Sequence, residues 1–252
     1  TYIIGGCNAA DVTSEKGVTL NLSDVRADTA IYGGCNEKGN VAKTTINIFG
    51  DVSPSSDSHA YTSVFGGGRG EQTTVRVTNI YAQNGTVTGK LYGGSGFGRV
   101  DESHVTVREW ENAGISRIVI TGDVFGGGYG ESSVVGSTDV LINTKLRIHD
   151  PNMPDGNNFD LSVTEELAST TDGDAPSGET SVKVNWINAK NTVSRICGNV
   201  YGGGDMGQVG KGIIYSGTNT AAISKDGFTH VRLQSGYVEG DIYGGGSGKP
   251  AS

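Results

Sequence analysis

The stretch Val124-Phe125-Gly126-Gly127 decides the fold of this chain, because its pattern of an aliphatic residue, a second bulky residue and two glycines recurs along the sequence. The seven copies are Ile3-Ile4-Gly5-Gly6, Ile31-Tyr32-Gly33-Gly34, Val64-Phe65-Gly66-Gly67, Leu91-Tyr92-Gly93-Gly94, Val124-Phe125-Gly126-Gly127, Val200-Tyr201-Gly202-Gly203 and Ile242-Tyr243-Gly244-Gly245. Their first glycines lie 28, 33, 27, 33, 76 and 42 residues apart. Self-similarity at a period of roughly 20–50 residues indicates a stacked repeat architecture, in which each unit buries its apolar side against its neighbours.

A second phrase, apolar–polar–apolar, alternates with the first. Its copies are Leu20-Asn21-Leu22, Ile46-Asn47-Ile48, Val75-Arg76-Val77, Val105-Thr106-Val107, Val140-Leu141-Ile142, Val182-Lys183-Val184 and Val231-Arg232-Leu233. The period of two and the β-branched residues indicate strands with one buried face. A third, weaker strand precedes several Gly-Gly copies, as at Ile118-Val119-Ile120. No segment shows a sustained helical period, so one coil comprises about three short strands.

Equivalent positions carry equivalent residues from coil to coil, which predicts parallel stacking about 4.8 Å apart. Coils of 27–33 residues are shorter than the roughly 40–50 residues of a propeller blade. We therefore expect an all-β chain, a right-handed parallel β-helix (β-solenoid) of about eight coils that forms a single repeat domain over residues 1–252. Both ends lie beside a Gly-Gly copy, so we expect a piece of a longer repeat protein.

The longest interval between Gly-Gly copies contains two strand phrases, at Val140 and Val182. We interpret it as two coils whose intervening Gly-Gly copy is displaced by a long loop insertion at about 148–178. This segment is rich in Asp, Asn, Pro, Ser and Thr. Loops of this length are where function or disorder concentrates.

The paired glycines are expected to be structural. Either the backbone needs a positive φ at these corners, or a side chain would clash with the next coil. The glycines assigned this role are Gly33, Gly34, Gly66, Gly67, Gly126, Gly127, Gly202, Gly203, Gly244 and Gly245.

The aromatic position of the phrase is a candidate ligand-binding stripe. Side chains alternate along a strand, so the aromatic rings point outward if the aliphatic residues point inward. An outward stripe beside flat Gly-Gly backbone would suit stacking on sugar rings or covering by a partner. The alternative is an internal ladder of packed rings. The stripe comprises Tyr32, Phe65, Tyr92, Phe125, Tyr201 and Tyr243.

Evidence for a metal or cofactor is slight. Asp155, Asn157 and Asp160 in the insertion could bind Ca²⁺, although their order matches neither the EF-hand loop nor the nonapeptide calcium repeat. The alternative is a solvated polar loop, with no cofactor at all. Cys7 and Cys35 follow Gly-Gly in adjacent coils and could be stacked thiols or a disulfide.

Signals for catalysis are also weak. No nucleophile elbow, zinc-protease helix, phosphate loop or dinucleotide fingerprint occurs. His104 and His230 precede equivalent strand phrases, which indicates a repeat position. Charged residues that could cluster are Arg99, Asp101, Glu102 and Arg108, and separately Asp123 and Glu131.

Composition narrows the choice of partner. The chain has 252 residues, 42 glycines and a net charge of −8, which argues against nucleic acid because nucleic-acid binding needs a basic stripe. It has no apolar run long enough to span a membrane.

The phrases Gly-Asp-Val-Phe-Gly-Gly-Gly (122–128), Gly-Asn-Val-Tyr-Gly-Gly-Gly (198–204) and Gly-Asp-Ile-Tyr-Gly-Gly-Gly (240–246) resemble the repeats of large, Gly-rich, adhesin-like surface proteins of gut bacteria. The resemblance implies a secreted or cell-surface β-solenoid with a structural or adhesive role, which binds polysaccharide or a host surface protein. The competing expectation is a polysaccharide lyase or glycoside hydrolase built on a β-helix. That alternative rests on fold analogy, which does not fix function.

Overall fold

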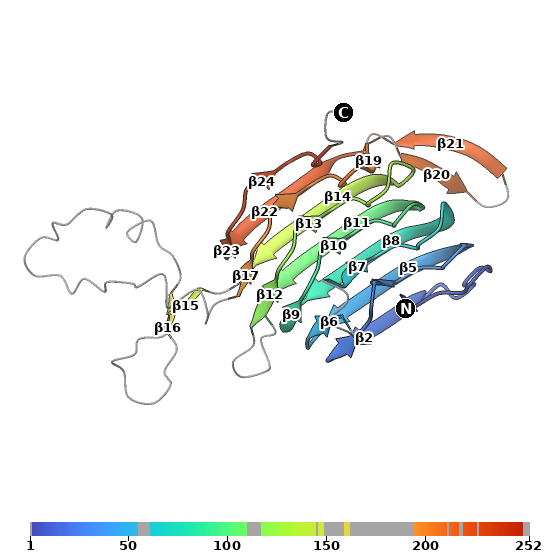
Figure 1. The fold of residues 1–252 in the computed structure, drawn as a ribbon. Helices are drawn as coiled ribbons and strands as arrows, with labels where there is room; N and C mark the ends of the chain where they lie inside the picture. Colours follow the sequence, from blue (N-terminus) through green and yellow to red (C-terminus); the bar gives the residue numbers. More distant parts are fainter. Residues whose placement is uncertain are drawn as a thin grey trace, which may run out of the picture.

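The computed structural model describes residues 2–54, 61–109, 117–144, 146–148, 159–161, 194–210, 212–216, 219–225 and 227–248. Every regular element in these ranges is a β-strand, and three long sheets contain most of them. Figure 1 shows the strands side by side in sequence order from the blue N-terminal to the red C-terminal end. The prediction of an all-β chain is confirmed. Within the described ranges there is no helix long and apolar enough to cross a membrane.

The first sheet, which we call sheet A, collects the Gly-Gly phrases. Neighbouring strands pair in parallel and in register, so that Ile31 lies between Ile3 and Val64, and Val124 lies beside Leu91. In order, its strands are β1 (Tyr2–Ile4), β4 (Ala30–Tyr32), β7 (Ser63–Phe65), β10 (Leu91–Tyr92), β13 (Val124–Phe125), β18 (Val200–Tyr201) and β24 (Ile242–Tyr243).

Two further parallel sheets follow the same plan. Sheet B contains β2 (Val18–Leu22), β5 (Lys38–Ile48), β8 (Gln72–Ala82), β11 (Arg99–Arg108), β14 (Val134–Asn143), β19 (Gln208–Val209) and β22 (Thr229–Ser235). Sheet C contains β3 (Val25–Arg26), β6 (Val52–Ser53), β9 (Gly85–Val87), β12 (Ile118–Ile120), β17 (Arg195–Ile196) and β23 (Tyr237–Val238). The chain visits sheets A, B and C in turn, an order that is compatible with a β-helix.

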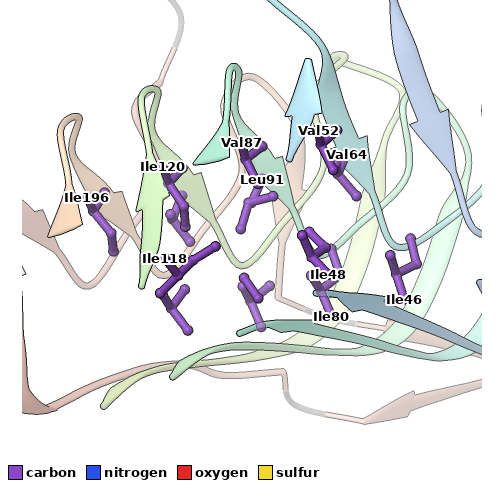
Figure 2. Close-up of a cluster of buried hydrophobic side chains, with 14 of the residues drawn as sticks. Ile46, Ile48, Val52, Val64, Ile80, Val87, Leu91, Ile118, Ile120 and Ile196 are labelled. Atoms are coloured by element: carbon purple, nitrogen blue, oxygen red, sulfur yellow. The ribbon is translucent and has the colours of Figure 1, made fainter. Parts of the chain in front are cut away.

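The interior is an aliphatic core shared by the three sheets. Figure 2 shows Ile46, Leu91 and Ile120 among the side chains that meet there, one from each sheet, and all three are fully buried. In-register stacking places β-branched residues over one another, and each complete burial is worth about 1.5–3 kcal/mol.

The register corrects one strand phrase. Ile80 in β8 pairs with Ile46 in β5, so Ile80-Tyr81-Ala82 is the equivalent of Ile46-Asn47-Ile48, and Val75-Arg76-Val77 is not. Val75 instead stacks with Val41 and Val100 in a second, smaller apolar cluster at the beginning of the sheet B strands. Each of these long strands has apolar residues in two places, one near its beginning and one near its end. The apolar–polar alternation alone cannot show which of the two places is equivalent from coil to coil.

The paired glycines allow close contact between coils. A Cβ at Gly33 would lie 2.5 Å from the carbonyl oxygen of Gly66, and a Cβ at Gly34 would lie 2.7 Å from the amide nitrogen of Gly68. Glycines of this phrase are absent from the positive-φ residues of the described chain. Of the two reasons considered above, the clash with the next coil is therefore the one that applies.

Buried hydroxyl groups brace the same corner. The Thr78 hydroxyl donates to the carbonyl oxygen of Gly93 at 2.6 Å, and the Thr44 hydroxyl donates to that of Gly66 at 2.7 Å. Ser103 and Thr138 donate to Gly126 and Gly202 in the same way. These hydroxyls satisfy carbonyl groups that face each coil's interior, where an unmade hydrogen bond is costly.

In the part of the chain that the structure describes, the long interval after Gly126 holds no additional coil in sheets A and C. Strand β13 pairs directly with β18, through Val124 and Val200, and β12 pairs directly with β17. The interpretation of this interval as two coils is therefore wrong. The inserted residues include a hairpin of β15 (Leu146–Ile148) and β16 (Phe159–Leu161), whereas Val182-Lys183-Val184 lies outside the described residues.

The last sheet B segment also carries an insertion. Strand β14 pairs with β19 at Val134–Val135 and with β22 from Thr138 onward. Between β19 and β22 the chain forms an antiparallel hairpin of β20 (Gly212–Ser216) and β21 (Asn219–Lys225), which projects from the end of the stack in Figure 1.

Candidate functional site

The aromatic residues of the Gly-Gly phrase form a continuous stack on the face of sheet A that points away from the aliphatic core. In β4, β7, β10, β13 and β18 the aliphatic and aromatic residues belong to separate clusters, as alternation predicts. Successive ring centroids from Tyr32 to Tyr243 lie 4.6, 4.5, 4.9, 4.7 and 4.9 Å apart, with interplanar angles of 2–12°. We call this stack the aromatic ladder.

Most of the aromatic ladder is buried despite its outward direction. Phe65, Tyr92 and Phe125 are only 5, 2 and 1% exposed, whereas Tyr243 at the end is 43% exposed. Each inner ring has neighbours on both faces, so a sugar ring cannot stack on it without displacing one of them. Ligand binding by the stripe as a whole stays a prediction.

Turns that follow the Gly-Gly phrases cover the ladder. The ring of Tyr129 meets Tyr92 edge-on, with centroids 5.9 Å apart and planes at 77°. A Cβ at Gly96 would lie 3.2 Å from the Tyr32 ring, so this turn packs closely against the hydroxyl end of that ring. The cover explains why Tyr32 has its pKa raised to about 12, since burial disfavours the phenolate.

A polar cluster converges on Tyr92. The Lys90 ammonium lies 3.1 Å from a carboxylate oxygen of Asp123 and 3.4 Å from one of Asp205. The Tyr92 hydroxyl donates to the same Asp205 oxygen at 3.0 Å. The ammonium also lies 5.3 Å from the centroid of the Phe125 ring, within cation–π range. Three neighbouring coils therefore contribute to one network of opposite charges.

The network fixes the protonation states of Tyr92 and Lys90. Burial, followed by the charge of Asp205 and the hydrogen bond to it, raises the pKa of Tyr92 well above its ordinary value. Burial disfavours the Lys90 ammonium, but the hydrogen bond to Asp123 and the charge of Asp205 outweigh it and raise the Lys90 pKa. A neutral phenol and a charged ammonium are poor general bases near pH 7.

Two aromatic side chains of the turns remain open to solvent. Phe97 is 39% exposed and Tyr129 is 38% exposed, and their rings meet edge-on with centroids 6.0 Å apart. Sequence reasoning missed both residues, because they lie after the Gly-Gly phrase at positions whose residue type changes from coil to coil.

The histidine pair predicted to share a repeat position does so. His104 and His230 are both register partners of Asp139, at 4.0 and 3.6 Å from its carboxylate. Arg232 binds the same carboxylate with two nitrogen atoms, at 3.1 and 2.6 Å. The imidazoles are 41 and 55% exposed, and polar contacts at such exposed positions add little to stability.

Of the charged residues that could cluster, Arg99 and Asp101 lie together. Arg99 lies 3.4 Å from Asp101. Burial raises the pKa of Asp101 although the Arg99 guanidinium opposes the shift. Asp123, considered with Glu131, has Lys90 as its ion partner.

The predicted calcium ligands are only partly described. Asp160 lies in β16 opposite Arg147, while Asp155 and Asn157 lie outside the described residues. Within the described ranges, no group of three or more His, Cys, Asp or Glu side chains could hold a metal ion. Cys7 and Cys35 are free thiols in the second apolar cluster, and burial raises the Cys35 pKa.

Comparisons of the chain with protein-family models, with curated proteins and with solved structures found no match.

Proposed function

We propose that this chain is a non-enzymatic repeat domain of a secreted or cell-surface protein, with an adhesive and structural role. Its fold is proposed to be a right-handed parallel β-solenoid, the hand that parallel crossover connections adopt in nearly all cases. The seven strands of sheet A support about seven coils, one fewer than the spacing predicted. The proposed partner is a polysaccharide or a host surface protein.

The observation that carries this proposal is that the repeated residues all serve packing between coils. The paired glycines bring coils together, the hydroxyls of Thr44 and Thr78 satisfy backbone carbonyls, and the aromatic ladder packs against itself. Repetition therefore supports a rigid stack whose turns are displayed at the surface. A stack of this kind suits display and attachment.

A polysaccharide-cleaving enzyme is the second candidate. It is favoured by the convergence of Lys90, Tyr92, Asp123 and Asp205 at one place. Against it, both carboxylates contact the same ammonium, and the Tyr92 phenol is held neutral. A phenol with a raised pKa is a poor general base near neutral pH.

One incubation separates the two candidates. The full chain is mixed with immobilised and soluble forms of neutral and acidic polysaccharides, and both retention and new reducing ends are measured. Retention without new ends is the expected result. New reducing ends would contradict the proposal in favour of the enzyme, and loss of both signals would leave a spacer or a protein-binding module.

A further inference from the structure

We infer that Phe97 and Tyr129, together with Lys90, Asp123 and Asp205, form a binding site for a neutral glycan. We call these five residues the turn platform. The inference rests on the proposed adhesive function and names the surface and the class of ligand through which it acts.

The two aromatic residues are unusual for their place in the stack. Aromatic residues of the ladder beside them, such as Tyr92 and Phe125, are 2 and 1% exposed, whereas Phe97 and Tyr129 are 39 and 38% exposed. They occupy neighbouring turns that are joined by backbone hydrogen bonds from Tyr129 to Ser95 and from Gly130 to Gly96. Two exposed rings on adjacent turns make a local apolar surface.

Packing from below holds the rings in place. Phe97 lies against the backbone of Gly130, where any Cβ would overlap its ring. Tyr129 rests edge-on against the buried Tyr92 ring. Because the two exposed rings stand at 79° to one another, they present a corner rather than a flat surface. A pre-formed aromatic surface binds at a lower entropic cost than a mobile one.

Polar groups lie next to this corner. Asp205 lies in the turn after β18. Its amide donates to the carbonyl oxygen of Gly128, and the amide of Met206 donates to that of Tyr129. Its carboxylate accepts from Tyr92, Lys90 and Ser247 and is 19% exposed. Fixed carboxylate oxygens and an ammonium beside aromatic faces are the combination that orients a ligand rich in hydroxyl groups.

Charge selects a neutral glycan over an acidic one. The turn platform contains two carboxylates and one ammonium, and the whole chain has a net charge of −8. A polyanion would approach a surface of its own sign, which lowers both its affinity and its association rate. The hydroxyl groups of a neutral sugar can donate hydrogen bonds to the carboxylates of Asp123 and Asp205 while its C–H face lies on an aromatic ring.

The test is affinity electrophoresis of the full chain in gels containing neutral polysaccharides (β-glucan, galactomannan, xylan, starch) or acidic ones (polygalacturonate, hyaluronate). The wild type should be retarded by at least one neutral polymer, and Phe97→Ala and Tyr129→Ala should each weaken this binding at least tenfold. Tyr61→Ala is the matched control, because Tyr61 is a 62% exposed tyrosine outside the turn platform. It should bind as the wild type does.

Two additional variants keep the test decisive. Phe97→Leu preserves an apolar side chain against Gly130 but removes the flat ring, and Asp205→Asn preserves shape but removes the charge. Both should unfold near the wild-type temperature and bind at least fivefold more weakly. If the wild type binds a neutral polymer and all platform variants bind equally well, the platform is wrong and the adhesive function stands.

A wild type that binds only acidic polymers, or only host protein, would also overturn the turn platform, and the adhesive function would again survive. A wild type that binds no polysaccharide and no protein would end both. Retention by the neutral polymer should persist at high salt, because a neutral ligand is not held by charge.

Discussion

Removal of the Phe125 ring should destabilise the protein more than removal of any exposed aromatic ring. Phe125 is 1% exposed and stacks between Tyr92 and Tyr201 at 4.9 and 4.7 Å. A ring of this size buries about 200 Å², worth about 5 kcal/mol at about 25 cal/mol per Å². Measured Phe→Ala substitutions in cores cost about 3–5 kcal/mol, so we expect about 4 kcal/mol for Phe125→Ala.

The assay is guanidinium denaturation followed by far-ultraviolet circular dichroism. With an m value of about 4 kcal/mol/M, a loss of about 4 kcal/mol lowers the midpoint by about 1 M. Tyr243→Ala is the matched control, since Tyr243 is 43% exposed and stacks on Tyr201 at the end of the ladder. Its midpoint should fall by only a small fraction of that amount. Equal losses for the two variants, or an unchanged midpoint for Phe125→Ala, would refute the buried ladder.

Three further predictions concern the corner and the ladder. Gly66→Ala should lower the free energy of unfolding by about 1–3 kcal/mol, because the new Cβ would lie 2.8 Å from the Thr78 Cβ. Gly244→Ala is the control, since no atom lies within 4 Å of a Cβ there, and it should change stability by less than about 0.5 kcal/mol in the same denaturation assay. Thr78→Val should cost about 1–3 kcal/mol of stability, because it leaves the Gly93 carbonyl without its buried donor. Thr106→Val, on the solvent side of sheet B, is the control and should be near neutral. Similar losses of stability for both variants would contradict the role of the Thr78 hydroxyl. Tyr32 keeps its proton in the folded state up to about pH 12 but loses it from about pH 10 in the unfolded state, so the free energy of unfolding should fall by about 1.4 kcal/mol per pH unit across that window. The Tyr32→Phe variant should lack this share of the alkaline loss of stability. A pH profile that the substitution leaves unaltered would count against the burial of the Tyr32 hydroxyl.

The Gly-Gly phrase predicted sheet A well, because one physical need recurs in every coil. An aliphatic residue must fill the interior, and the glycines must admit the next backbone, so the residue types at these positions can hardly vary. The third strand, at Ile118–Ile120 and its equivalents, was likewise visible from its position before the phrase.

Sheet B was harder to align. Its strands are 10–11 residues long in β5, β8, β11 and β14, and each carries two apolar points that the sequence presents in the same way. Alternation therefore predicts the phrase at Val75 as the equivalent of Ile46, although Ile80 is the register partner of Ile46. The signal that identifies the correct register lies two residues before Ile46 and Ile80, where Thr44 and Thr78 repeat as buried hydroxyls.

The candidate site could be predicted only in part. Alternation gave the outward direction of the aromatic ladder but not its cover, because the covering turns belong to other coils. The contact between Lys90 and Asp205 joins residues 115 positions apart, across an interval whose coil number the sequence did not reveal. Phe97 and Tyr129 carry no repeating signal, so only the folded stack shows that they are neighbours.

The most direct test of the account is a disulfide between positions 123 and 199, which are 76 residues apart in sequence. Their strands β13 and β18 are neighbours, and the Asn199 amide donates to the Asp123 carboxylate at 2.8 Å. Strand spacing of about 4.8 Å lies within the range for a disulfide, and two strand spacings do not. With Cys197 replaced by serine, Asp123→Cys with Asn199→Cys should form the bond under mild oxidation, seen as faster migration without reductant. Lys90→Cys with Asn199→Cys, two strands apart, should not. Failure of the first pair, or equal yield from the second, would contradict the stacked arrangement on which the proposed function depends.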